Sequence, residues 1–303
     1  MINSVTYFLD KIVGNYKGGF VIAYHQISEN RFIEHQQLFE KLEAIPLIEL
    51  LKRNKNGLNT KGLYSITIDD AYENTIEPLT QNLKVPITIF VQTDYIKGII
   101  PDFVKFYIYQ DLSNLDIVKN EYFNKFSIAI DNFFSELKLI LYSQKTSQFN
   151  KFCEHYADFL KTNNFISDES MKNFLPSIGP LLISKLSKNE LISFESHGKS
   201  HQPVSALTKD ELSHELKSSI NEILQLTGKV SKIFCYPYGQ QISIGNIAPE
   251  LVSLLFEFAV TMNPGRIKSS NPYLIPRIPF FEKDYKLRAL AKISTLFYKQ
   301  NGY

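Results

Sequence analysis

The feature that most constrains the fold of this chain is the alternation of short apolar runs with longer stretches that suit helices. Seven of these runs are rich in β-branched and aromatic residues and have the length of buried strands. They are Phe20–Tyr24, Leu63–Ile68, Ile87–Val91, Ile192–Phe194, Ile233–Tyr236, Phe258–Thr261 and Leu274–Ile278. Because helical stretches separate them, they predict parallel βα units, and about seven such strands predict a closed α/β barrel.

The most distinct helix is expected at residues 208–227. Thr208 and Glu211 have the spacing of a capping box at its start, and Gly228 supplies a stop at its end. Between them an apolar stripe recurs at helical spacing: Leu212, Leu216, Ile220, Ile223 and Leu224. In barrels of parallel strands the chemistry gathers where the strands end at their C-terminal side, so polar residues at strand ends are the first candidates for a site.

Length and composition limit the domain organisation and the partners. With 303 residues, 44% of them hydrophobic, the chain can bury one large core, so a single domain over residues 1–303 is expected. The net charge of +2, from 33 basic and 31 acidic residues, leaves no electrostatic footprint for nucleic acid. Cys153 and Cys235 lie in segments of different character, and no disulfide between them is expected.

The first residues give an expectation about location. Residues 1–11 lack a basic leader followed by an unbroken apolar core and a small-residue cleavage site, so they do not resemble a signal peptide. No apolar run is long enough to span a bilayer. We therefore expect a cytoplasmic protein without a transmembrane segment, and the sequence leaves its oligomeric state open.

Two motifs carry the chemistry of a metal site. Asp69 and Asp70 close the strand candidate that ends at Ile68, and His197 and His201 lie four residues apart much further along the chain. One carboxylate and two imidazoles leave a fourth position open for water, which is how catalytic zinc is held, and the other aspartate could take the proton of that water. Each motif alone has a simpler explanation, because acids often begin solvated loops and paired histidines recur on helices by chance.

A third segment and the order of the motifs give the chain a resemblance to a known family. The segment Cys235-Tyr236-Pro237-Tyr238-Gly239 closes another strand candidate with a Pro/Gly turn. Together with Thr67-Ile68-Asp69-Asp70-Ala71 and the His197–His201 segment, it resembles the polysaccharide deacetylases, also called the NodB-homology group or carbohydrate esterase family 4. The resemblance covers roughly residues 20–280, interrupted by one insertion.

The resemblance implies a fold, an activity and a role for each residue. The fold would be a distorted (β/α)7-type barrel with a helical insertion. The activity would be removal of an N-acetyl or similar small acyl group from a sugar or glycan, in cell-surface glycan metabolism. Asp70, His197 and His201 would bind a divalent metal, with zinc the best fit, and Asp69 would be the base. A backbone N–H near Tyr238 would stabilise the oxyanion.

The chain departs from the family pattern at three places. Ala71 replaces a glycine, which would be strained if the turn needs positive φ. The family's late histidine acid is absent, since no histidine follows His214, so Asp69 or His25 would have to return the proton, unless His25 is only a structural histidine. Cys235 stands where the family has an arginine. Arg277 could supply that charge to Asp69, or it could be a surface residue between two prolines.

Residues 100–185 form the insertion, and their aromatic side chains at helical spacing predict helices. These aromatics could form a lid or platform for sugar rings or a lipid carrier, or they could simply bury one another; helical spacing favours the second interpretation. Two other functions also remain open. The chain could be a sugar-binding pseudoenzyme that lacks its acid, or a deformylase or O-deacetylase on the same scaffold.

Overall fold

The strands form a closed parallel barrel, as the sequence predicts. The computed structural model describes residues 18–267 and 271–298. Among them, β1 pairs with both β8 and β3, which closes seven strands into a ring, while the two-residue β2 lies outside it against β3. The strands are β1 (Phe20–Tyr24), β2 (Glu43–Ala44), β3 (Leu63–Ile68), β4 (Ile87–Val91), β5 (Ile192–Ser196), β6 (Ile233–Cys235), β7 (Phe258–Pro264) and β8 (Ile275–Pro279). The predicted (β/α)7-type barrel is therefore confirmed.

The predicted strand ends are wrong by up to three residues in the second half of the barrel. The largest difference is in β7, which runs on to Pro264 because Pro264 pairs with Arg277 of β8. The register between these two strands shifts between Val260 and Pro264. An irregularity of this kind re-aims side chains at the rim of a barrel, and it cannot be read from an apolar run.

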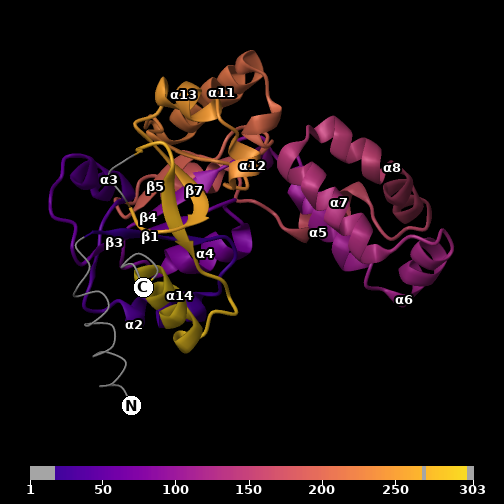
Figure 1. The fold of residues 1–303 in the computed structure, drawn as a ribbon, viewed down its shortest axis with the longest axis horizontal. Coiled ribbons are helices and arrows are strands. Elements are labelled where there is room, and N and C mark those ends of the chain that lie inside the picture. Colours follow the sequence, from indigo (N-terminus) through magenta and orange to yellow (C-terminus); the bar gives the residue numbers. More distant parts are fainter. Residues whose placement is uncertain (1–17, 268–270, 299–303) are drawn as a thin grey trace.

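Helices cover the outside of the barrel (Figure 1). Side chains on successive strand residues alternate between an outer layer against these helices, such as Ile22 and Ile66, and an inner layer such as Val21 and Phe90. The covering helices are α2 (Glu29–Leu38), α3 (Leu47–Lys55), α4 (Glu73–Gln81), α11 (Lys209–Thr227), α12 (Gln241–Ile244), α13 (Ala248–Ser253) and α14 (Lys286–Tyr298), with short turns η1 (Tyr95–Lys97) and η3 (Val204–Ala206).

Helix α11 begins and ends where the sequence predicts. The Thr208 hydroxyl accepts from the Glu211 backbone N–H, and the Glu211 carboxylate accepts from the Thr208 backbone N–H. Gly228 ends the helix in the left-handed conformation. The helix thereby leads from the histidine segment to β6.

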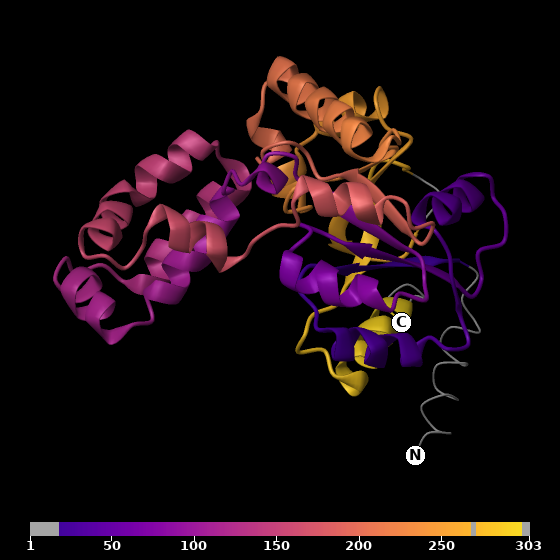
Figure 2. The same cartoon turned by 180° about the vertical axis from the view of Figure 1, so that it is seen from behind.

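The insertion between β4 and β5 is helical and stands beside the barrel as a separate lobe (Figures 1 and 2). Its aromatic side chains form a core of their own, with Tyr122, Phe123 and Tyr156 in mutual ring contact. Its elements are α5 (Asp102–Leu112), α6 (Asp116–Val118), the π-helical turn η2 (Lys119–Asn124), α7 (Ile130–Ser143), α8 (Thr146–Thr162) and α9 (Asp168–Phe174), whereas α10 (Pro180–Leu186) packs on the barrel beside α11. Whether the chain is a single domain stays a prediction.

Three smaller expectations concern the cysteines, the membrane and the N-terminus. Cys153 and Cys235 are both free, and both are buried. Within residues 18–267 and 271–298, no helix combines the length and the apolar character needed to cross a bilayer. Residues 1–11, in which no signal peptide is expected, lie outside the described part of the chain.

Candidate metal and catalytic site

The two aspartates of the first motif share one site because the chain turns sharply where β3 ends. Adjacent residues of a regular strand point to opposite faces. Here Asp70 and Ala71 both take left-handed backbone conformations, with φ of 66° and 50°. The turn is held from outside, because the Ala71 carbonyl accepts from the Ile178 backbone N–H at 2.9 Å. Ala71 thus adopts a left-handed conformation that is strained for alanine and that the family's glycine would adopt without strain.

The histidine segment is a loop held by a carboxylate of α11. His197 directly follows β5, and His201 has a left-handed φ of 59°. One oxygen of Glu215 accepts from the Lys199 and Ser200 backbone N–H groups at 2.8 and 2.6 Å. The sequence analysis missed Glu215. A carboxylate next to Leu216, on the apolar stripe of a helix, was the signal that could have found it.

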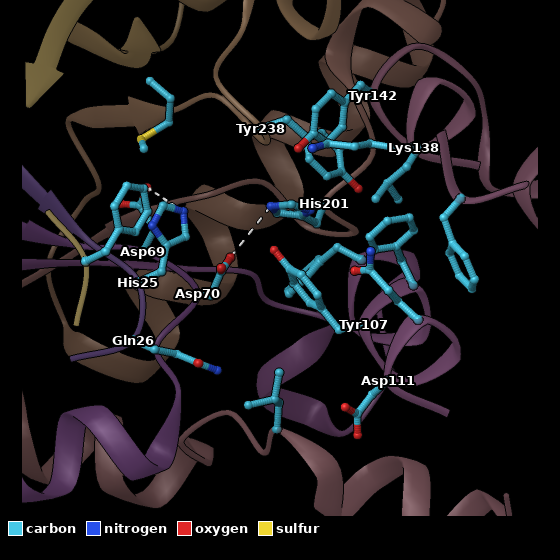
Figure 3. A pocket seen from close by; sticks show the side chains of 18 of the residues that line it. His25, Gln26, Asp69, Asp70, Tyr107, Asp111, Lys138, Tyr142, His201 and Tyr238 are labelled. Carbon is cyan, nitrogen blue, oxygen red and sulfur yellow. Dashed lines mark ion pairs between the residues drawn. The ribbon is translucent and has the colours of Figure 1, made fainter. Parts of the chain in front are cut away.

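Asp70, His197 and His201 converge and are all buried. The distance from Asp70 Oδ1 to Nε2 of each histidine is 3.6 Å, and Figure 3 shows Asp70 facing His201. Their potential ligand atoms all lie within 4.8 Å of one another. His197 Nδ1 donates to the Cys235 carbonyl at 2.8 Å, so its Nε2 keeps a lone pair that faces Asp70. Gln92 donates to Asp70 Oδ1 at 2.6 Å and orients that carboxylate.

The donor set fits a divalent cation of the zinc type. Two imidazoles and one carboxylate are ligands that borderline metals prefer. A histidine binds a metal only when its imidazole is neutral. Burial lowers the pKa of His197 against the opposing effect of Asp69 and Asp70. Burial and the neighbouring His197 lower the pKa of His201 well below its ordinary value. Both rings are therefore held in the state that a ligand needs.

Asp69 is paired with Arg277, which is fully buried. The two guanidinium NH groups donate to Oδ1 and Oδ2 of Asp69, both at 2.7 Å. The predicted contact is thus present, and the alternative of a surface arginine is wrong. Burial alone would raise the pKa of Asp69, but the Arg277 guanidinium outweighs it and holds that pKa well below its usual range.

Arg277 reaches Asp69 across the space that the cysteine of the third motif leaves open. Its NH2 group also lies 3.1 Å from Cys235 Sγ, and its other nitrogens donate to the Thr261 carbonyl and to the Thr67 hydroxyl, both at 2.9 Å. A small side chain at position 235 is what lets a guanidinium from β8 enter the barrel here. The charge that the third motif lacks is therefore present on a different strand.

His25 and Tyr238 also lie at the site. His25 Nε2 is 3.7 Å from Asp69 Oδ2, and about a third of its side chain is exposed. The Tyr238 ring lies 4.6 Å from the His201 ring. Within the described residues, no acceptor engages the Tyr238 backbone N–H. Gly239 fixes this turn, because a Cβ there would lie 2.4 Å from the Met262 backbone nitrogen.

These residues open into a cavity of about 1370 Å³ that the insertion helps to line (Figure 3). One wall is the barrel rim, with His25 and Phe281, and the other includes Tyr107, Lys138 and Tyr142 of the insertion. The aromatics of the insertion therefore do two things. Most bury one another, as expected, but one face also lines the site, and the platform interpretation stays a prediction.

Comparisons with known proteins agree with the motifs. The family model for polysaccharide deacetylase matches residues 149–246, which include His197, His201 and the third motif. No curated protein matches the chain.

Among solved structures, IcaB from Ammonifex degensii superposes with a TM-score of 0.57 at 13% identity, over 92% of this chain and 98% of that one. The Streptococcus pyogenes deacetylase PplD in complex with acetate gives 0.54 at 12%, over 91% and 97%. The de-N-acetylase from Aggregatibacter actinomycetemcomitans gives 0.55 at 11%, over 90% and 99%. At such identities these matches concern the fold. Together with the family match, they confirm the resemblance to polysaccharide deacetylases.

The geometry predicts that the metal depends on both histidines. Purified protein should carry about one divalent ion per chain after dialysis against zinc. His197→Ala and His201→Ala should each remove most of it, because two remaining ligands hold a divalent ion poorly. Elemental analysis by mass spectrometry measures this. His214→Ala, an exposed histidine of α11, is the matched control and should keep the ion. Full metal content in the double variant of His197 and His201 would contradict the assignment.

The buried ion pair predicts strong coupling between Asp69 and Arg277. Arg277→Met should cost about 3–5 kcal/mol of unfolding free energy, because it leaves the Asp69 carboxylate buried without its partner. Adding Asp69→Asn should recover part of that loss, since the uncompensated charge is then gone. Urea denaturation of the two single variants and the double variant measures the coupling. Additive losses would show that the pair is not a unit.

Proposed function

We propose that this protein is a metal-dependent hydrolase that removes an N-acetyl or similar small acyl group from a sugar of a glycan. The observation that carries the proposal is the pairing of two carboxylates with different partners: Asp70 faces two histidines, while Asp69 beside it is bound by Arg277. The first would serve as a metal ligand and the second as a base. A role in cell-surface glycan metabolism is part of the proposal.

Asp70, His197 and His201 would hold the metal, for which zinc fits best. When bound there, such an ion supplies Lewis acidity, which lowers the pKa of a water to about 7 and polarises the acyl carbonyl. The burial of all three residues supports this assignment, because a dry site strengthens every electrostatic interaction within it.

Asp69 would take the proton of the attacking water. The Arg277 fork keeps it ionised and fixes the direction of both oxygens, so it is ready to accept a proton without reorganisation. The same pairing makes Asp69 a weaker base. Asp69 can therefore deprotonate only a water whose pKa has already been lowered. The Tyr238 backbone N–H would donate to the oxygen on which negative charge develops, and one such donor is typically worth about 10²–10³ in rate.

The leaving amine needs a proton, and we assign its return to His25. The imidazole lies beside Asp69 and lines the cavity, so it can receive the proton that Asp69 collects and pass it to the amine. This assignment replaces the late histidine that the chain lacks.

A binding-only role is less well supported than turnover. Sugar binding alone would need neither a base nor its fixed orientation, yet Asp69 is held by both nitrogens of the Arg277 fork and approached by Cys235. Removal of formyl or of an O-acetyl group would use the same residues. Measuring acetate against formate release, and amide against ester substrates, separates these reactions.

The base and the ligand should separate in variants of the two neighbouring aspartates. Asp69→Asn should lower the turnover of N-acetylated glucosamine oligomers by about 10²–10⁴, because an amide cannot accept the proton, while the metal stays bound. Asp70→Ala should lose metal and turnover together. Acetate release and elemental analysis on the same samples measure both. Equal metal loss in the two variants would show that their roles are reversed.

The role of His25 predicts a dependence on the leaving group. His25→Asn should slow amide hydrolysis by about 10²-fold or more, because a departing amine must be protonated. Hydrolysis of 4-nitrophenyl acetate should fall far less, since nitrophenolate departs without a proton. Initial rates on both substrates measure the difference. An equal loss on both would assign His25 to a structural role.

A further inference from the structure

The insertion turns two different faces to its surroundings. On α7, Phe134, Leu137 and Leu141 are buried in the core of the lobe. The neighbouring stripe at helical spacing, Asp131, Ser135, Lys138 and Tyr142, lines the cavity of the metal site, and the edges of Phe134 and Leu141 line it too. On α5, Tyr107, Gln110 and Asp111 line the same cavity. A lobe whose only purpose was to bury its aromatics would not need this second face.

The cavity face carries groups that are free to bind. Tyr107 is 49% exposed although it is aromatic, and it is exposed toward the cavity (Figure 3). Lys138 is exposed and extends over the Tyr142 ring, 5.6 Å from its centroid. Among the described residues, no ion pair or hydrogen bond engages Lys138. Aromatic surfaces combined with single hydroxyl, amide and ammonium groups suit a ligand that has apolar ring faces and many hydroxyls.

The face is held at a fixed place relative to the metal ligands. The Tyr142 ring lies 5.0 Å from the Tyr238 ring, which in turn contacts His201. Phe103 of α5 also packs on His201, with 4.5 Å between ring centroids. Where the insertion returns to the barrel, the Glu73 backbone N–H donates to the Pro176 carbonyl at 2.8 Å. The wall is therefore preformed rather than a loose lid, which limits the ordering cost of binding.

The size of the cavity indicates how large the ligand is. Pockets for single small molecules usually measure about 300–1,000 Å³, and this one reaches about 1370 Å³. The metal ligands lie between the barrel rim, with Gln26 and Phe281, and the insertion face. One sugar ring at the metal would leave the space along α5 and α7 unfilled.

We propose that the α5–α7 face is a saccharide-binding wall, in which Tyr107, Lys138 and Tyr142 hold the sugar rings next to the one that is deacylated. This inference rests on the proposed function and deepens it, because it assigns the binding of the flanking sugar rings to residues of the insertion. Charges of both signs line the wall, Lys138 opposite in sign to Asp111 and Asp131, so it selects a hydroxyl-rich chain and not a polyanion.

Chain-length dependence tests the wall. Metal-loaded wild-type protein should prefer the pentamer of N-acetylglucosamine to the monomer by about tenfold or more in kcat/KM, a factor equivalent to about one good hydrogen bond. Tyr107→Ala, Tyr142→Phe and Lys138→Ala should each reduce that preference severalfold, mainly through a higher KM for the pentamer, with metal content retained. A kcat/KM that is the same for monomer and pentamer would overturn the inference.

Control substitutions elsewhere in the insertion separate a loss of sugar binding from a general loss of folding. Lys161→Ala on α8 and Tyr122→Phe in the lobe's core lie outside the cavity, and both should keep the wild-type preference. If they abolish it as well, the wall has no special part in it and the inference fails.

Binding without turnover separates this inference from the proposed function. In the Asp69→Asn protein, calorimetry should give a lower Kd for the pentamer than for the monomer, and Lys138→Ala on that background should remove the difference. This result would support the wall even if no deacylation is found. Equal Kd values for both sugars would overturn the wall even if the enzyme proves active.

Discussion

The buried guanidinium of Arg277 is the interaction on which the site depends. From β8 it contacts the carbonyl of Thr261 on β7, Cys235 on β6, and Thr67 and Asp69 at the end of β3. A charge in such a position is tolerated only when every donor finds an acceptor, and here all do. The ends of four barrel strands are thus tied together at the point where the two aspartates must turn toward one another.

Backbone strain is concentrated at the same end of the barrel. Three separate loops contain non-glycine residues with positive φ: Asp70 and Ala71 in the first, His201 in the second and Tyr238 in the third. Each such residue costs on the order of 1–3 kcal/mol, and it persists only where its surroundings hold it. Glu215 holds the histidine loop, and the close approach of Gly239 to Met262 holds the loop that contains Tyr238. The site is therefore built before any ligand arrives, at the expense of local stability.

The sequence predicted what depends on pattern and missed what depends on packing. Seven apolar runs defined the barrel, and the resemblance led to Arg277, because the family has an arginine that holds the aspartate where this chain has Cys235. Gln92 was missed, since a single contact to Asp70 leaves no periodic trace, and Glu215 was missed although it lies on the apolar stripe of α11. The second face of the insertion was also undervalued. Helical spacing identifies a buried stripe, but which side meets the barrel is decided by distant contacts such as Glu73 with Pro176.

In the proposed reaction, the pairing that fixes Asp69 also determines where the proton can go. A carboxylate paired with a guanidinium has a lowered pKa, so a proton that it takes from water must be passed on quickly. An imidazole is ordinarily the stronger base of the two, and His25 lies 3.7 Å away on the cavity side. An arginine on β8 instead of in the third motif and the absence of the late histidine are then compatible departures from the family's pattern. The first keeps Asp69 ionised and strongly acidic once protonated, and with the second the proposed route gives the proton to His25.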